Sequence, residues 1–242
     1  MTAPNMAKRL KRIRNRGGKV VVIDPRRTET AKLADEHHFI RPGTDAVFLL
    51  AWLHVLVEEI GIQSGAWEQY TDGLDVIRAL ATRISPEKAE AICGIPADTI
   101  RAIVTEATEA SSSAVYGRIG VCTQRFGGLG AWLINVINIV SGRLDVPGGV
   151  MFTQPAVDFL PLAPRGHYDI WRSRVRGLPE FGGELPVSTL AEEMDTPGDG
   201  QIRAFLTIAG NPVLSSPNGS RLERALPNLD FMVCIDPYIN ET

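Results

Sequence analysis

Two short segments carry the residue types that could bind a nucleotide, and their sequences are half identical. KVVVIDPRRTET (residues 19–30) aligns without gaps on FMVCIDPYINET (residues 231–242), with six of the twelve positions identical. In each copy an apolar run ends at an Asp-Pro pair, Asp24-Pro25 or Asp236-Pro237. Open α/β sheets hold a nucleotide's ribose or base with an acidic residue at the carboxyl end of a parallel strand. The repeat therefore predicts two nucleotide-like sites related by an approximate internal symmetry.

The predicted helix and strand around each Asp-Pro pair also recur. A Pro-Asn pair precedes each copy, and apolar residues at helical spacing follow it, before the strand. In the first copy this pattern predicts a helix over 6–16 and a strand over 20–23. The strand is β-branched without alternation, which is typical of a parallel strand covered on both faces. The sequence therefore predicts an α/β fold with mostly parallel sheets.

Further elements are predicted between the two copies. A helix is expected to begin at Thr44 or Asp45, either of which can act as N-cap, and to end before Gly61. It is apolar nearly all round and should be buried. The other expected elements are a strand at 39–40, a helix opening at 95–98, a strand over 114–119, a flexible loop at 127–130, a helix over 131–140 and a strand over 205–208.

The first sheet looks complete near residues 122–126, which predicts two domains, 1–122 and 123–242. Residues 151–200 are rich in Pro and Gly and predict a long loop in the second domain. A loop of this length inside a compact domain is usually functional or packs against another polypeptide.

Composition limits the classes of function. A net charge of −3 predicts no general affinity for nucleic acid or membranes, and no apolar run reaches the ~18 residues of a membrane span. Cys93, Cys122 and Cys234 are widely spaced, so we expect no metal or iron–sulfur site built from this chain alone. Unpaired thiols fit a reducing, cytoplasmic setting.

Several residues also have an ordinary structural interpretation. Asp24 could cap the helix that follows it, although its recurrence as Asp236 favours a binding role. The basic run from Lys8 to Lys19 could suggest nucleic acid, but an apolar stripe beneath it favours a solvated helix face. His54 lies in an apolar helix and is expected to be a core histidine. For His167, Arg118 and Cys122 the sequence supports no firm role.

Six segments together resemble one known family. They are IDPRRTETAKLADEH (23–37), IRPGTDA (40–46), GVCTQ (120–124), SGRLDVPGG (141–149), AGNP (209–212) and IDPYINET (235–242). In this order they resemble the large molybdopterin oxidoreductases, the group that contains formate dehydrogenases, nitrate reductases and dimethyl sulfoxide reductase.

The resemblance implies a molybdenum bis(molybdopterin guanine dinucleotide) cofactor. Each half would be held by one of two related Rossmann-like three-layer α/β domains. One guanosine would be held by Asp24, Pro25, Arg26, Arg27 and Thr28, with Gly43, Thr44 and Asp45 closing over it. Gly120 and Gln124 would reach the pterin, and Asn211 and Asp236 would serve the second dinucleotide.

The resemblance also implies a function, the cofactor-binding central part of a formate dehydrogenase-like enzyme. Such an enzyme carries out two-electron redox chemistry on a small-molecule substrate and passes electrons to an electron-transfer partner. In the family the molybdenum ligand and an iron–sulfur domain precede this region, so no catalytic residue or metal ligand is assigned here. We expect both domains to be incomplete and to need N- and C-terminal segments or a complementing chain.

Two alternatives stay open on the sequence. One is a non-catalytic truncated remnant, or a subunit that needs another chain for the molybdenum ligand. The other is a nicotinamide-binding domain, which is disfavoured because no Gly-x-Gly-x-x-Gly motif follows a strand.

Overall fold

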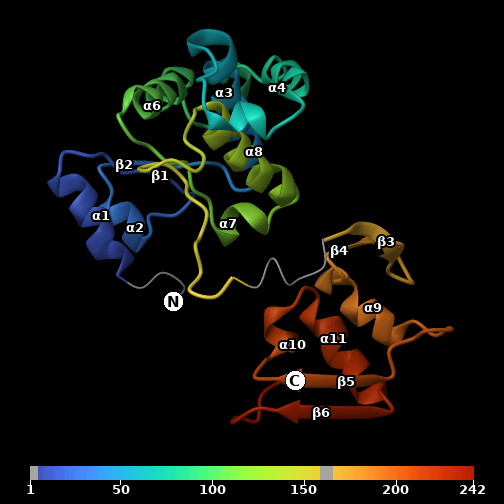
Figure 1. Cartoon of the computed structure of the whole chain (residues 1–242). Helices are drawn as coiled ribbons and strands as arrows, with labels where there is room; N and C mark the ends of the chain where they lie inside the picture. Colours follow the sequence, from blue (N-terminus) through green and yellow to red (C-terminus); the bar gives the residue numbers. More distant parts are fainter. Residues whose placement is uncertain (1–4, 159–165) are drawn as a thin grey trace. The chain divides into compact units, whose positions relative to one another are not determined.

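The two repeated segments each contribute a strand to a separate parallel pair (Figure 1). The computed structural model describes residues 5–158 and 166–242. The chain forms two units, Met1–Gln154 and Pro155–Thr242. The fold is mixed α/β with small parallel sheets, which confirms the predicted class at that level.

In the first unit a parallel strand pair follows the N-terminal helix. Strand β1 (Val21–Ile23) pairs in parallel with β2 (Glu36–His38). The short helix α2 (Glu29–Leu33) connects the two strands. The other helices are α1 (Met6–Asn15), α3 (Asp45–His54), the π-helix η1 (Val55–Ile60), the 3-10 helix η2 (Ala66–Gln69), α4 (Leu74–Ala81), α5 (Pro86–Cys93), α6 (Ala97–Glu109), α7 (Ile119–Cys122) and α8 (Gly127–Val140).

Helix α3 is the centre of this unit's core, as its apolar sequence predicts. It packs against α4, α5, α6 and α8, and Ala51 and Leu53 have no exposed surface. Val21 and Ile23 of β1 pack against the same core. The helix continues into η1, where the N–H of Gly61 donates to the carbonyl of Leu56 at 2.9 Å. Gly61 ends it because its φ of 107° is a conformation that side-chain-bearing residues rarely adopt.

Helix α8 begins at Gly127, so the predicted flexible loop at 127–130 is wrong. The glycines allow α8 to approach α7. A Cβ atom on Gly127 would lie 2.0 Å from the carbonyl oxygen of Cys122, and one on Gly130 would lie 2.8 Å from Cγ1 of Val121. The glycines are therefore required by close packing within the helix pair.

Two predicted strands also differ from the structure. The strand expected at 39–40 lies at Glu36–His38, where Lys19 forms ion pairs with Glu36 and with Glu106 of α6, both at 2.5 Å. The segment 114–119 forms no strand and holds its place through a side chain instead. Asn138 of α8 accepts from Val115 N at 3.0 Å and donates to Val115 O at 2.8 Å.

The second unit places an antiparallel hairpin and short helices before its parallel pair. The hairpin strands β3 (Tyr168–Arg172) and β4 (Pro179–Phe181) and the helix α9 (Leu190–Asp195) fall within 151–200, so this segment is not one long loop. The remaining elements are η4 (Val187–Thr189), β5 (Ala204–Ile208), α10 (Pro212–Ser215), α11 (Gly219–Ala225), η5 (Leu226–Asn228) and β6 (Phe231–Ile235).

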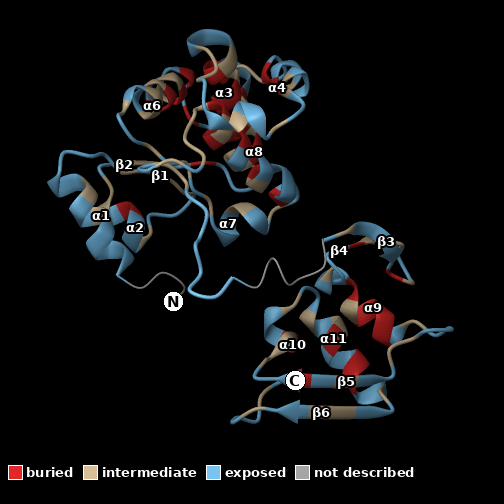
Figure 2. Cartoon of the chain, in the orientation of Figure 1, coloured by how far each residue is buried: buried red, intermediate tan, exposed pale blue. Residues whose placement is uncertain are grey.

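The β5–β6 sheet has two unlike faces. Phe205 and Met232 pack against an apolar cluster that includes Met194 of α9 and Leu222 of α11. The alternating positions are exposed, and Figure 2 shows that most of β5 and β6 is exposed while buried residues gather on α9 and α11. The exposed apolar side chains on the other face are Leu206, Ile208, Phe231 and Ile235. We call these four residues the open face.

Candidate functional site

The first repeated segment ends β1 in a tight aspartate turn. The N–H of Asp24 extends the ladder to His38 O at 3.2 Å, and its Oδ1 accepts from the N–H of Arg26 at 2.7 Å. His37 Nε2 lies 3.0 Å from the carbonyl of Asp24, so this nitrogen is the one that donates. Thr28 Oγ1 accepts from Ala31 N at 3.2 Å and caps α2.

The second repeated segment forms the same turn after β6. Asp236 Oδ1 accepts from the N–H of Tyr238 at 2.9 Å, two residues on, as Asp24 does from Arg26. Each carboxylate therefore follows the repeated strand directly, although β1 pairs with the strand after it in the chain and β6 with the strand before it. In neither turn does the second carboxylate oxygen, Oδ2, have a hydrogen-bond partner among the described residues.

Asn211 lies against the far end of the second loop. Its Nδ2 donates to Glu241 Oε2 at 2.6 Å, and its Oδ1 accepts from Thr242 Oγ1 at 2.8 Å. The hydrogen bond from Asn211 lowers the pKa of the Glu241 carboxyl from its usual value. Thr242 Oγ1 also accepts from Val213 N at 3.1 Å. Asn211 and Asp236 thus hold the two ends of one loop.

The chain reaches Asn211 through a strained residue. Ala209 has a φ of 50°, in the left-handed region where a Cβ atom is disfavoured, and it follows β5 directly. Such strain persists only where the surrounding structure enforces it, and it is concentrated at functional sites. It turns the chain from the strand into the Gly-Asn-Pro segment at 210–212.

A third group joins the start of α3 to the loop after α7. Gln124 Nε2 donates to Asp45 Oδ2 at 2.6 Å and to the carbonyl of Gly120 at 2.7 Å. Gly43 precedes this helix with a φ of 85°, and the Thr44 hydroxyl donates to Arg41 O at 2.7 Å. Thr44 is the N-cap residue by position, but its side chain makes no capping hydrogen bond.

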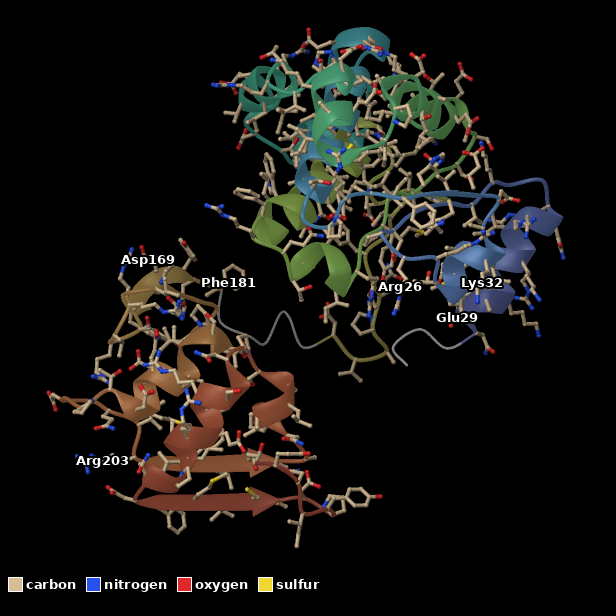
Figure 3. All side chains as sticks on the ribbon, turned by 180° about the vertical axis from the view of Figure 1, so that it is seen from behind. Arg26, Glu29, Lys32, Asp169, Phe181 and Arg203 are labelled. Carbon is tan, nitrogen blue, oxygen red and sulfur yellow. The ribbon has the colours of Figure 1, made fainter. Side chains whose placement is uncertain are left out.

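The structure thus sorts the predicted site residues into three groups. Asp24 to Thr28 form one turn, Gly120 and Gln124 meet Asp45, and Asn211 and Asp236 belong to the second unit. Pro25, Arg26 and Arg27 are exposed, and Figure 3 shows Arg26 at the loop after β1 with Glu29 and Lys32 on α2. Among the described residues no hydrogen bond joins the Asp24 turn to Gly43, Thr44 or Asp45.

Sequence reasoning missed the residues that support these groups. Glu241 and Thr242 are recognisable in the sequence because they repeat Glu29 and Thr30, but the repeat alone predicts no role for them. His37 and Asn138 gave no usable signal, because their partners are distant in sequence. A cavity of about 230 Å³ lies next to the third group, with Tyr116, Cys122 and Asn135 among its lining residues.

A buried carboxylate outside all predicted groups lies in the β3–β4 hairpin. Glu180 has no exposed surface, and its carboxylate lies against Nδ1 of His167. Burial raises the pKa of the Glu180 carboxyl. The N–H groups of Ile170 and Gly183, at 2.9 and 3.1 Å, and the His167 ring outweigh burial and bring the pKa below its usual value.

The described part of the chain contains neither a cluster of potential metal ligands nor a membrane-spanning helix. Within residues 5–158 and 166–242, no three His, Cys, Asp or Glu side chains are grouped so that they could hold a metal ion. No helix in these ranges has the length and apolar character needed to cross a membrane.

Comparison with known proteins decides the family. A model of the molybdopterin oxidoreductase family matches residues 2–242. The chain belongs to this family. Membership implies a molybdenum–pterin cofactor, and it confirms the resemblance found in the sequence.

Individual relatives match nearly the whole chain. An F420-dependent formate dehydrogenase subunit alpha of Methanocaldococcus jannaschii is 27% identical, over 99% of this chain and 37% of its own length. A periplasmic nitrate reductase of Desulfovibrio desulfuricans is 25% identical, over 92% of this chain and 33% of its own length. The chain therefore spans about a third of the length of these relatives.

A solved structure shares the fold. Acetylene hydratase from Pelobacter acetylenicus superposes with a TM-score of 0.78 over 95% of this chain and 36% of its own, at 20% sequence identity. At this identity the likeness concerns the fold alone.

Proposed function

We propose that this chain is the cofactor-binding part of a formate dehydrogenase-like molybdenum oxidoreductase, and that it holds a bis(molybdopterin guanine dinucleotide). The observation that carries this proposal is the recurrence of one aspartate turn. Asp24 and Asp236 end parallel strands in different units, with Oδ1 bonded at 2.7 and 2.9 Å to the N–H two residues on. Two equivalent carboxylates suit a cofactor with two equivalent nucleotide ends.

The donors and acceptors of these turns fit a guanosine. In each turn Oδ2 is left to accept from the N–H groups of a guanine edge. The exposed Arg26 and Arg27 suit phosphate, because a guanidinium matches phosphate geometry. Pro25 and Thr28 shape this loop, and Gly43, Thr44 and Asp45 would close over the same nucleotide.

The third group suits the pterin end of the cofactor. Gln124 bridges Asp45 and Gly120 with one amide nitrogen, which leaves its Oε1 free to accept from a pterin N–H. Asn211 and Asp236 would serve the second dinucleotide through the loop that they hold. The bound cofactor would supply the two-electron chemistry, while these residues bind and orient it.

The exposed strands favour a larger assembly. Parallel sheets are normally covered on both faces, yet the open face of β5–β6 is apolar and exposed. We infer that each parallel pair belongs to a Rossmann-like three-layer domain that further polypeptide completes. That polypeptide would bring the molybdenum ligand, an iron–sulfur cluster and contact with an electron-transfer partner. The three free cysteines suit a cytoplasmic enzyme.

The same open face supports a second candidate, a non-catalytic subunit that acts only when another chain covers it. The two candidates differ in the cofactor content of the isolated chain. A cofactor-binding part retains pterin by itself, whereas a subunit of the second kind acquires it only in the complex.

The test is cofactor retention by the chain produced in a host that makes the cofactor. After denaturation and oxidation, fluorescence should reveal the pterin, and hydrolysis should release guanine in equal amount. Asp24→Asn and Asp236→Asn each keep an oxygen for the turn but lose the charge, so each should lower both signals several-fold. Asp75→Asn, at an exposed aspartate of α4, is the matched control and should lower neither. A folded chain that retains no pterin and binds no guanosine diphosphate would contradict the proposal.

A further inference from the structure

The two aspartate turns are alike in backbone and unlike at their apex. Counting from each aspartate, Arg26 and Arg27 of the first loop correspond to Tyr238 and Ile239 of the second. The turn hydrogen bond is the same in both loops, since Oδ1 accepts from the N–H of Arg26 or Tyr238. Equivalent backbones therefore present two cations at one site and an aromatic and an aliphatic side chain at the other.

Each apex pair is presented by a loop that is tied at both ends. Asp24 and Thr28 hold the first loop through the turn and the α2 cap. In the second loop Asp236 holds one end, and Asn211 holds the other through Glu241 and Thr242. The apex side chains therefore project from ordered loops.

The second apex exposes an unusual amount of apolar surface. Tyr238 is 79% exposed and Ile239 is fully exposed, and neither side chain has a hydrogen-bond or ring partner among the described residues. An exposed aromatic face without a partner is suited to stacking on a nucleobase, an interaction that every base can make. The turn itself does not require an aromatic and an aliphatic residue here, because it is formed by the aspartate and a backbone N–H.

The charges around the two loops also differ. Residues 19–30 contain three cationic and two acidic residues, whereas the equivalent residues 231–242 contain no Lys or Arg and two acidic residues. Arg26 and Arg27 have no ionic partner among the described residues, so they are available to a phosphate. The second loop offers no cation to a phosphate at all.

We infer that the chain recognises two nucleotide ends by different chemistry, ionic at the first loop through Arg26 and Arg27, and apolar at the second through Tyr238 and Ile239. This inference rests on the proposed function, because it assumes that both loops bind guanosine ends. Dissolved salt screens exposed ionic contacts but has little effect on stacking. The two ends should therefore differ in their dependence on salt and on the phosphates of the ligand.

The experiment is calorimetric titration of the full chain with guanosine diphosphate and with guanosine, at low and high salt. Two sites are expected for the diphosphate. Raising the salt about tenfold should weaken the first site by about tenfold and the second by less than about twofold. The second site should bind guanosine nearly as well as the diphosphate, whereas the first should not.

Paired variants assign the sites. Arg26→Gln with Arg27→Gln should remove the salt-dependent site, while lysine at both positions should restore it in part. Tyr238→Ser should weaken the salt-independent site and Tyr238→Phe should not. The matched controls are Arg83→Gln and Tyr70→Ser, at exposed residues of the first unit, and they should change neither site.

The possible results distinguish a failure of this inference from a failure of the proposed function. Two diphosphate sites with equal salt dependence, or sites unaffected by the arginine and tyrosine variants, would overturn the inference alone. A folded wild-type chain that binds neither ligand would overturn the inference and the proposed function together.

Discussion

Asn138 shows how much one buried side chain can position. It is 2% exposed and bonds both backbone groups of Val115 as well as the carbonyl of Ile134, at 2.8 to 3.0 Å. Asn138→Ala leaves two half-buried backbone groups without partners. We expect the free energy of unfolding to fall by about 1–3 kcal/mol, measured by urea denaturation.

The matched control is Asn135→Ala on the same helix. Asn135 is exposed and donates only to Ala131 O of its own helix, so the change should be within about 0.5 kcal/mol. Equal losses for the two variants would show that the contacts with Val115 contribute nothing to stability.

Replacing either of two neighbouring glycines at the start of α8 by alanine should change the stability in opposite directions. A Cβ atom on Gly127 would overlap the carbonyl of Cys122, so Gly127→Ala should destabilise by about 1–3 kcal/mol. Gly128 is exposed with open space around it, so Gly128→Ala should stabilise by about 0.5–1 kcal/mol, because alanine loses less backbone entropy. Thermal unfolding of both variants tests this, and a stabilised Gly127→Ala would contradict the packing of α7 on α8.

For single residues, the sequence identifies those in the repeated motif and misses those whose contacts form only in the folded chain. Asp24 and Asp236 could be found because the same motif occurs twice with the same neighbours. The role of Asn138 could not be predicted, because its partner Val115 is 23 residues away and no periodic pattern connects the two residues. Whether the predicted residues bind the cofactor stays a prediction.

Among the elements, the β3–β4 hairpin depends on one ionised group. The Glu180 pKa is lower in the folded chain than in the unfolded chain, because Ile170, Gly183 and His167 stabilise the charged form more than burial disfavours it. Folding therefore favours the deprotonated form. Its contribution to stability is complete above the unfolded pKa and is lost as pH falls through the folded pKa.

Amide hydrogen exchange can follow this loss directly. The N–H groups of Ile170 and Gly183 should be protected at neutral pH and lose protection as the pH falls below the usual pKa of a glutamate, after correction for intrinsic rates. Glu180→Gln should remove the pH dependence. Glu184→Gln, at an exposed residue just after β4, should keep the pH dependence. Protection that is independent of pH in the wild-type chain would contradict the role of the carboxylate.

Elements with a strong apolar pattern are predicted well, and those built by long-range polar contacts are not. The helix at 45–60 and the strands at 21–23 and 204–208 lie where their apolar runs place them. The hairpin lies in a Pro- and Gly-rich segment whose composition indicates a loop, and its polar contacts centre on the carboxylate of Glu180, which folding buries. Similarly, β2 contains Glu36 and two histidines, which no apolar pattern would mark.

For the molecule as a whole, the open face predicts association. Ile208 and Ile235 are cross-strand neighbours, 67% and 57% exposed, on an apolar surface that water disfavours. Ile208→Lys with Ile235→Glu puts opposite charges across the strand pair and should abolish concentration-dependent association of the isolated chain, measured by sedimentation velocity. Val76→Lys, at an exposed apolar residue of α4, should leave association unchanged. A wild-type chain that stays monomeric at every concentration would contradict this prediction.

The π-helical stretch η1 should make the chain sensitive to insertions and deletions at this point. His54 Nε2 lies 3.9 Å from Glu59 Oε1, although residues five apart in an α-helix point about 140° away from each other. His54 also reaches Ala81 O at 2.9 Å, and Glu59 pairs with Arg101 of α6 at 2.9 Å. Deleting one residue from 55–60 would turn everything after it by about 100° and separate these partners. The extra residue in this π-helical turn therefore orients His54 toward α4 and Glu59 toward α6. An insertion or deletion here would disrupt the contacts of α3 with both helices.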